Sequence, residues 1–187
     1  RQAASGNVLY IDAWLKLAQA EAELGQTDKA VQILRFTDEL TADVVKWKWE
    51  HILLARELGV EDIFLKNLND VIPNYKLRRD ALQLLDTHFG NDAAGVLSVI
   101  TAENKPHYLR WLMRWRRADD AWLTWQAMSR AAKEKDCLYA DYVHFLVRQK
   151  EIQRADRIWR QYTGSSGMIN PGFEKELTRR GFGWRYW

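Results

Sequence analysis

The side chains best able to bind a metal ion are four histidines, His51, His88, His107 and His144, and the single cysteine, Cys137. Cys137 and His144 are seven residues apart. In a helix they would share a face but lie about 10 Å apart along the axis, which is too far for two ligands of one zinc ion. No histidine pair has the HExxH spacing, and there is no CxxC pair. We therefore expect no specific metal, nucleotide or covalent cofactor.

Motifs of nucleophilic catalysis and phosphate binding are also missing from the sequence. It contains no GxSxG motif and no Gly-rich phosphate loop. Adjacent carboxylates occur at Glu61-Asp62 and at Asp119-Asp120, where helices are expected to begin and negative charge complements the helix dipole. The sequence therefore predicts a protein that is not an enzyme.

A basic and aromatic segment, KPHYLRWLMRWRRADDAWLTWQ, is the most unusual internal stretch. Between Lys105 and Arg117 it has five basic residues and no acidic one. Arg110, Arg114 and Arg117 follow helical spacing, and they would form a stripe that could bind a phosphate, an acidic peptide or a sugar. Alternatively, these arginines are only solvated. For the tryptophans at 111, 115, 122 and 125 the favoured interpretation is packing in a helical core.

The composition fits an ordinary soluble chain apart from its tryptophan content. Of 187 residues, 47% are apolar and 28% charged, the net charge is +3, and ten are Trp. One cysteine excludes an internal disulfide, and no apolar run approaches the roughly 18 residues of a membrane span. The chain starts without Met, and we interpret it as a fragment. The compartment is left open, with a periplasmic or membrane-associated location slightly favoured for the full-length protein.

Helical patterns recur along the chain at a fixed period. Leu17, Ala18, Glu21 and Leu24 share one helix face, and Gly25 follows as a stop signal. The pairs Leu24-Gly25 and Leu58-Gly59 are 34 residues apart, as are Ala121 and Ala155, each of which is followed four residues later by a Trp. This is the period of tetratricopeptide repeats.

The first unit resembles a tetratricopeptide repeat at Trp14, Leu17, Ala18, Gly25, Ala30 and Leu34. Later units depart from the pattern: Phe64 stands where a small Ala is expected, and the pairs around 107–131 and 137–162 lack the turn glycine. The resemblance implies an all-α fold, a right-handed superhelix of about five antiparallel helix pairs. The expected helices span 8–24, 28–40, 43–58, 61–71, 76–88, 92–103, 107–116, 118–132, 137–149 and 152–162.

The resemblance also implies that the first helix of each pair lines a concave groove. The partner-binding residues expected on this basis are Lys46, Trp49, Leu53 and Arg56, then Arg110, Met113 and Arg114, then Asp141, His144 and Arg148, with Arg117 added from the basic stripe. In the first pair the resemblance points to Asp12, Leu15 and Gln19.

The C-terminal part of the chain differs in composition. We divide the chain into a helical repeat domain, 1–163, and a linker and tail, 164–187, that begins with GSSG. Asn170, Gly172, Phe173 and Glu174 resemble the opening strand of a carbohydrate-binding jelly roll, although Pro171 stands where that family prefers Gly. Alternatively, the tail is a non-helical segment whose aromatic residues dock on the last helix pair.

These patterns together favour a non-catalytic scaffold that binds a protein segment on its concave face. The likeness of the tail to a sugar-binding domain suggests a role in bacterial exopolysaccharide or cell-surface assembly. The alternative is a helical repeat that binds nucleic acid or an acidic polysaccharide through the face between Lys105 and Arg117. Nucleic-acid binding would require Trp111 or Trp115 to be exposed for base stacking.

Overall fold

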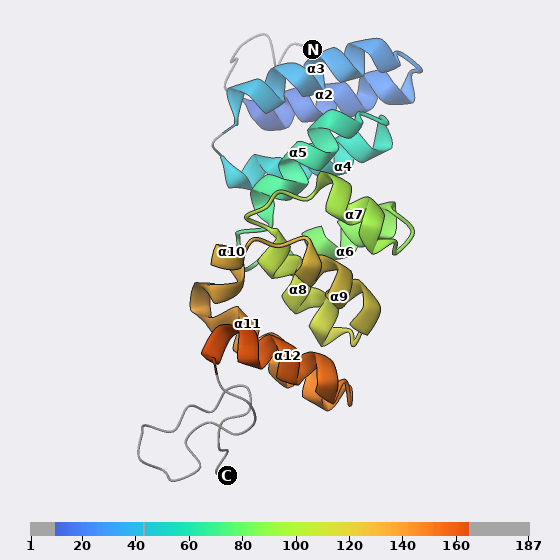
Figure 1. Ribbon diagram of the computed structural model, residues 1–187. Helices are drawn as coiled ribbons and strands as arrows, with labels where there is room; N and C mark the ends of the chain where they lie inside the picture. The colour runs from blue at the N-terminus through green and yellow to red at the C-terminus, as the bar shows by residue number, and fades with distance from the viewer. Residues whose placement is uncertain (1–9, 43, 165–187) are drawn as a thin grey trace. The chain divides into compact units, whose positions relative to one another are not determined.

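The computed structural model describes residues 10–42 and 44–164, and all regular structure in these ranges is helical (Figure 1). The all-α prediction is confirmed for this part of the chain. The chain divides into two compact units, residues 1–91 (unit 1) and 92–187 (unit 2). The predicted tail after residue 164 and the expected helix start at residue 8 lie outside the described residues.

Unit 1 consists of antiparallel helices that pack on their neighbours in sequence. Its helices are α2 (Ile11–Glu23), α3 (Thr27–Leu40), α4 (Val45–Glu57), α5 (Glu61–Val71) and α6 (Arg78–His88). The helix pairs α2–α3 and α4–α5 are packed along their length, and α3 also contacts α4 while α5 contacts α6. Ala18, Ala30 and Ala55 have no exposed surface. Small residues at these positions allow the helices to approach closely, while Leu34 and Ile52 fill the core.

Unit 2 contains shorter helices. They are α7 (Ala93–Val99), α8 (Lys105–Arg114), α9 (Ala118–Gln126), α10 (Arg130–Glu134), the 3-10 turn η1 (Lys135–Cys137), α11 (Leu138–Arg148) and α12 (Ile152–Thr163). Helix α8 pairs with α9, and α11 pairs with α12. Contacts between α8 and α11 place the first helices of these two pairs next to each other.

Helices α2, α4, α6, α8 and α11 end in the same type of turn. In each, a backbone N–H donates to the carbonyl five residues earlier, for example Gln26 to Glu21 at 2.8 Å and Glu151 to Leu146 at 2.9 Å. The residue before the donor has a positive φ, as in the Schellman motif. These residues are Gly25, Gly59, Gly90, Arg116 and Lys150. The turn is therefore kept where the sequence lacks the glycine.

The 34-residue spacing has a structural counterpart within each unit. Ala121 and Ala155 lie five residues after the left-handed residues Arg116 and Lys150, and both are fully buried. Trp125 and Trp159 follow four residues later and are also buried. In unit 1, Ala30 and Phe64 occupy the corresponding positions after Gly25 and Gly59. The larger Phe64 is accommodated there without exposure.

Two expected helices end several residues before their predicted bounds. The predicted helix 118–132 is interrupted, because α9 ends at Gln126 and α10 begins at Arg130. Ser129 caps α10 by accepting a hydrogen bond from the Ala132 N–H at 3.2 Å. The predicted helix 92–103 ends at Val99, because Ile100 adopts an extended conformation. The Ser129 hydroxyl thus satisfies a backbone donor in the first turn of α10.

Candidate functional site

A cavity of about 460 Å³ lies between α8 and α11 in unit 2. Helix α8 contributes Arg110, Met113 and Arg114, and the turn after it contributes Arg116. Helix α11 and its end contribute Asp141, His144, Phe145, Arg148 and Gln149. We call this feature the arginine cavity.

The arginine cavity brings together six residues that the sequence predicted for partner binding. These are Arg110, Met113, Arg114, Asp141, His144 and Arg148. Their shared location follows from the packing of α8 against α11, because each set lies on one face of its own helix.

Arg117, which the sequence predicted to extend the stripe of Arg110 and Arg114, does not line the arginine cavity. Its Nε donates to Asp120 Oδ2 at 2.6 Å, and its guanidinium lies 5.7 Å from the centre of the Trp111 ring. The physical reason is that Arg116 adopts a left-handed conformation, with φ of 58°. The chain has left the helix at that point, and helical spacing no longer predicts the direction of the next side chain.

The arginine cavity carries unbalanced positive charge. Among the described residues, no ion pair joins Arg110, Arg114, Arg116 or Arg148 to a carboxylate. Other arginines do form such pairs, and Arg160 lies 2.8 Å from Asp156. A concave surface with one dominant sign of charge concentrates oppositely charged ligands.

Only two of the four arginines that line the cavity occupy positions where their charge stabilises their own helix. Arg114 and Arg148 are the last residues of α8 and α11, where a positive charge complements the negative end of the helix dipole. Arg110 lies in the middle of α8 and is half-buried. Two like charges four residues apart, such as Arg110 and Arg114, destabilise a helix by about 0.2–0.5 kcal/mol. The arrangement therefore favours binding of an anion.

The lining of the cavity also has an apolar part. Met113 is half-buried, and Phe145 is 6% exposed. The Phe145 ring stacks against Tyr142, with ring centroids 6.0 Å apart. Methionine side chains adapt to ligands of varied shape. The cavity can thus contact an apolar group next to an anionic one.

The four tryptophans of the basic segment have different environments. Trp111 and Trp125 are 9% and 4% exposed, which confirms their predicted place in the core. Trp122 is half-buried beneath the Arg154 guanidinium, 5.2 Å from its ring. Trp115 is 54% exposed, so its predicted burial is wrong. It is the C-cap residue of α8 and has left the helix face that packs on the core.

The residues predicted for partner binding on α4 are exposed or half-buried. Lys46, Leu53 and Arg56 are exposed, and Trp49 is half-buried. The Lys46 ammonium lies 4.4 Å from the centre of the neighbouring Trp47 ring. The prediction is wrong for Leu15 on α2, which is only 7% exposed, because this residue packs into the core of unit 1.

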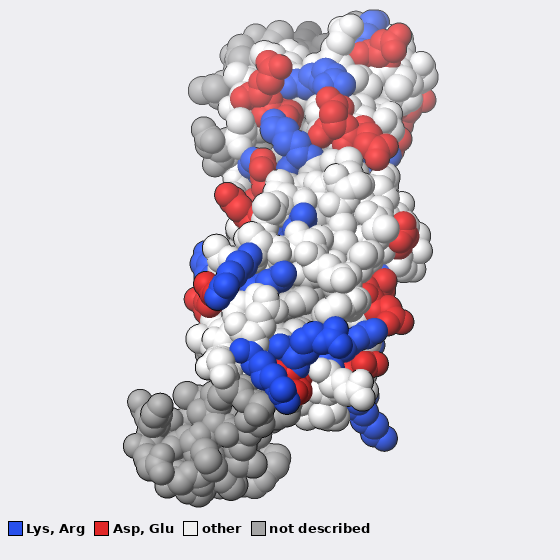
Figure 2. Space-filling view, viewed as in Figure 1, with Lys and Arg blue, Asp and Glu red and all other residues white. Residues whose placement is uncertain are grey.

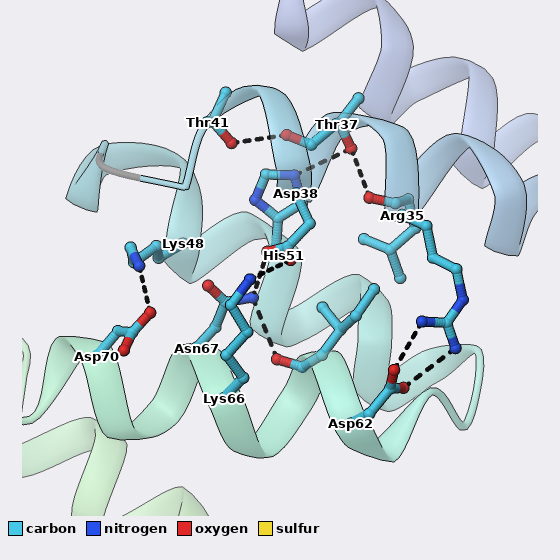
Figure 3. A network of polar contacts seen from close by, with 12 residues as sticks. Arg35, Thr37, Asp38, Thr41, Lys48, His51, Asp62, Lys66, Asn67 and Asp70 are labelled. Atoms are coloured by element: carbon cyan, nitrogen blue, oxygen red, sulfur yellow. Dashed lines mark hydrogen bonds and ion pairs between the residues drawn. The ribbon is translucent and has the colours of Figure 1, made fainter.

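Unit 1 contains a buried polar network that the sequence did not predict (Figure 3). His51 Nε2 lies 3.0 Å from Thr37 Oγ1, and the Thr37 hydroxyl lies 2.9 Å from the Leu34 carbonyl oxygen. Burial lowers the pKa of His51, which favours the neutral imidazole. Thr37 and His51 have no exposed surface, so this pair joins α3 to α4 and does not face a ligand.

Charged residues extend the network to α5. Asp38 accepts hydrogen bonds from Lys66 at 2.8 Å and from Asn67 at 2.6 Å, and Lys48 pairs with Asp70. Burial alone would raise the pKa of Asp38, but the hydrogen bonds from Lys66 and Asn67 outweigh burial and lower it. These contacts hold α3 and α4 against α5 (Figure 3).

The two units also differ in how their surface charges are arranged. On the face drawn in Figure 2, basic and acidic side chains of α2 and α3 lie next to one another, whereas several basic side chains lie side by side over α12.

Within the described ranges, no group of three or more His, Cys, Asp or Glu side chains is placed to hold a metal ion. No helix in those ranges has the length and apolar character needed to cross a membrane.

Comparisons of the chain with protein-family models, with curated proteins and with solved structures give no match.

Proposed function

We propose that the protein is a non-catalytic interaction module and that its arginine cavity binds an acidic segment of a partner protein. One observation carries the proposal: four arginines without a carboxylate partner among the described residues share one cavity. Arginine clusters are a recurring means of binding acidic motifs. Met113 and Phe145 supply apolar contacts for neighbouring side chains of such a segment.

The proposed scaffold role is that of a tetratricopeptide-like superhelix. It is supported by the recurring turn at Gly25, Gly59, Gly90, Arg116 and Lys150 and by the buried alanines that follow these turns. In such repeats the first helices of the pairs line the concave groove. Helices α8 and α11 are first helices, and α4 offers a second contact surface at Lys46, Trp49, Leu53 and Arg56. The suggested setting, bacterial exopolysaccharide or cell-surface assembly, depends on the tail, which lies outside the described residues.

The test uses a labelled peptide that alternates Glu with Leu, titrated with the full 187-residue chain and followed by fluorescence anisotropy. Replacing Arg110 and Arg148 by Glu should weaken binding at least about 100-fold, because each charged contact is worth about 1.5–3 kcal/mol. The control Arg79→Glu, Arg157→Glu makes the same charge change at exposed positions outside the cavity. Equal losses in both double variants, or no binding by the unmodified chain, would contradict the proposal.

Nucleic-acid binding remains the second candidate because Trp115 is exposed between Arg114 and Arg116. An exposed ring beside basic side chains can stack on a base. If this function holds, Trp115→Ala should weaken the binding of single-stranded RNA by about 1–3 kcal/mol, and affinity should fall steeply with salt. Unchanged RNA affinity in Trp115→Ala would remove this candidate.

A further inference from the structure

Asp141 is the acidic residue among the four arginines that line the cavity. It is half-buried and lies in the first turn of α11. The usual arrangement for a carboxylate among arginines is an ion pair, because pairing offsets the free energy of removing each charge from water. No such pair involves Asp141 among the described residues. Its carboxylate therefore stays available as a hydrogen-bond acceptor within an otherwise basic cavity.

An acceptor in this position affects which anions can bind. A carboxylate repels anionic groups that approach it and accepts hydrogen bonds from N–H or O–H groups. An acidic peptide carries a backbone N–H beside each anionic side chain, so it can approach both the arginines and Asp141. The internal phosphate groups of a polyphosphate present only oxygen acceptors at neutral pH, and one of their charges would face Asp141.

We propose that Asp141 is a specificity-determining residue that excludes polyanions lacking hydrogen-bond donors and selects anionic ligands that carry them. This inference rests on the proposed function, since it takes the arginine cavity as the binding site. It extends that proposal, because four arginines of the cavity attract anionic ligands while Asp141 repels those that lack hydrogen-bond donors. Specific binding sites commonly combine the two.

A purely structural role for Asp141 predicts a different result. Acidic residues in the first turn of a helix stabilise it through the helix dipole, and this role would make Asp141→Asn less stable without changing its preference among ligands. Asp119 supplies the matched control. It is an exposed acidic residue in the first turn of α9 and does not line the cavity.

The experiment measures the affinities of the unmodified chain, Asp141→Asn and Asp119→Asn for two probes by calorimetry. The probes are the Glu/Leu peptide and an inorganic polyphosphate of equal formal charge. In Asp141→Asn, polyphosphate should bind about tenfold more tightly because a like charge is removed. The peptide should gain clearly less, or should lose affinity, because its donor loses a charged acceptor. Asp119→Asn should leave the ratio of the two affinities unchanged.

Each result has one consequence. If the two affinities change by the same factor in Asp141→Asn, or if Asp119→Asn shifts their ratio as much, the proposed role of Asp141 is overturned while the cavity can still bind acidic segments. If the unmodified chain binds no peptide, the proposed function is overturned; a polyphosphate gain confined to Asp141→Asn would then still support exclusion by Asp141. A third probe, an oligogalacturonate, also carries donors; if it bound more tightly than the peptide, an acidic polysaccharide would replace the acidic protein segment as the proposed ligand.

Discussion

The neutral state of His51 makes the stability of unit 1 depend on pH. Burial lowers the folded-state pKa below the ordinary value of 6.5, so the unfolded chain binds a proton at a pH where the folded chain does not. Stability from this residue is fully present above pH 6.5 and is lost as the pH falls through the folded-state pKa. The loss should appear in urea unfolding followed at a series of pH values from 7.5 downward.

The variant His51→Gln isolates this effect. Its amide can still form a hydrogen bond with Thr37, but it has no proton to gain in this range. We expect a loss of about 1–2 kcal/mol at pH 7.5, because a buried hydrogen bond is disturbed, and a smaller difference from the unmodified chain at acidic pH. If the two proteins showed the same dependence on pH, the assignment of a lowered pKa to His51 would be wrong.

Asp38 should act in the same direction at lower pH. Its pKa is lowered from the ordinary value of 3.8, so the stability that it contributes is present above that value and is lost as the pH falls below it. Asp38→Asn should cost about 2 kcal/mol at neutral pH, since the group that accepts hydrogen bonds from Lys66 and Asn67 loses its charge. Chemical unfolding at pH 7 and near pH 3 checks this, and a cost that persists undiminished near pH 3 would contradict it.

At the level of residues, helical spacing in the sequence predicts which side chains share a location only as far as the helix continues. Arg110 and Arg114 occur together in the arginine cavity because both precede the end of α8. Arg117 does not line the cavity with them, because the left-handed residue Arg116 breaks the spacing. The partners of His51 could not be predicted, since Thr37 is 14 residues away and reaches it only through packing of α3 on α4.

At the level of elements, the turns at Arg116 and Lys150 hold residues with a Cβ in a conformation that favours glycine. Lys150 has φ of 65°, and Gly59 has φ of 68° in the equivalent turn. Lys150→Gly should therefore stabilise unit 2 by about 1 kcal/mol, because a left-handed residue with a side chain costs about 1–2 kcal/mol relative to other conformations. Urea unfolding measures the gain.

The reverse change, Gly59→Ala, provides the matched control. A Cβ at Gly59 would meet no other atom within 4 Å, so the expected loss of about 1 kcal/mol comes from the backbone conformation alone. If Lys150→Gly lowered stability while Gly59→Ala had no effect, the shared turn would not explain how these helices end.

Sequence periodicity located the pairs α2–α3, α4–α5, α8–α9 and α11–α12, but not every helix boundary. The apolar pattern continues through the region of Ala127 to Ala132, so it predicted one helix there. Ser129 is a recognised N-cap residue and was the signal for a new start at Arg130. Asp136 and Cys137, which both have positive φ, gave no comparable signal, because neither is a glycine.

At the scale of the whole molecule, the chain contains two compact units, each with its own buried residues. Ile52 in unit 1 has no exposed surface, and Ile158 in unit 2 is 3% exposed. In the proposed repeat architecture the free energy of unfolding is approximately a sum of local and nearest-neighbour terms. A small loss of packing should therefore lower the free energy of unfolding mainly in the unit where it occurs.

Hydrogen exchange followed by mass spectrometry tests this with a matched pair of variants. Ile52→Val and Ile158→Val each remove one methylene group and should each cost about 1 kcal/mol. A loss of that size speeds exchange through unfolding of the affected unit by about fivefold. We expect Ile52→Val to accelerate exchange of the protected amides between residues 10 and 91 while those from 92 to 164 keep their rates, and Ile158→Val to do the opposite. If either variant accelerated both ranges equally, the two units would unfold as one cooperative body. The pH effect of His51 would then reach the arginine cavity through the stability of the whole chain.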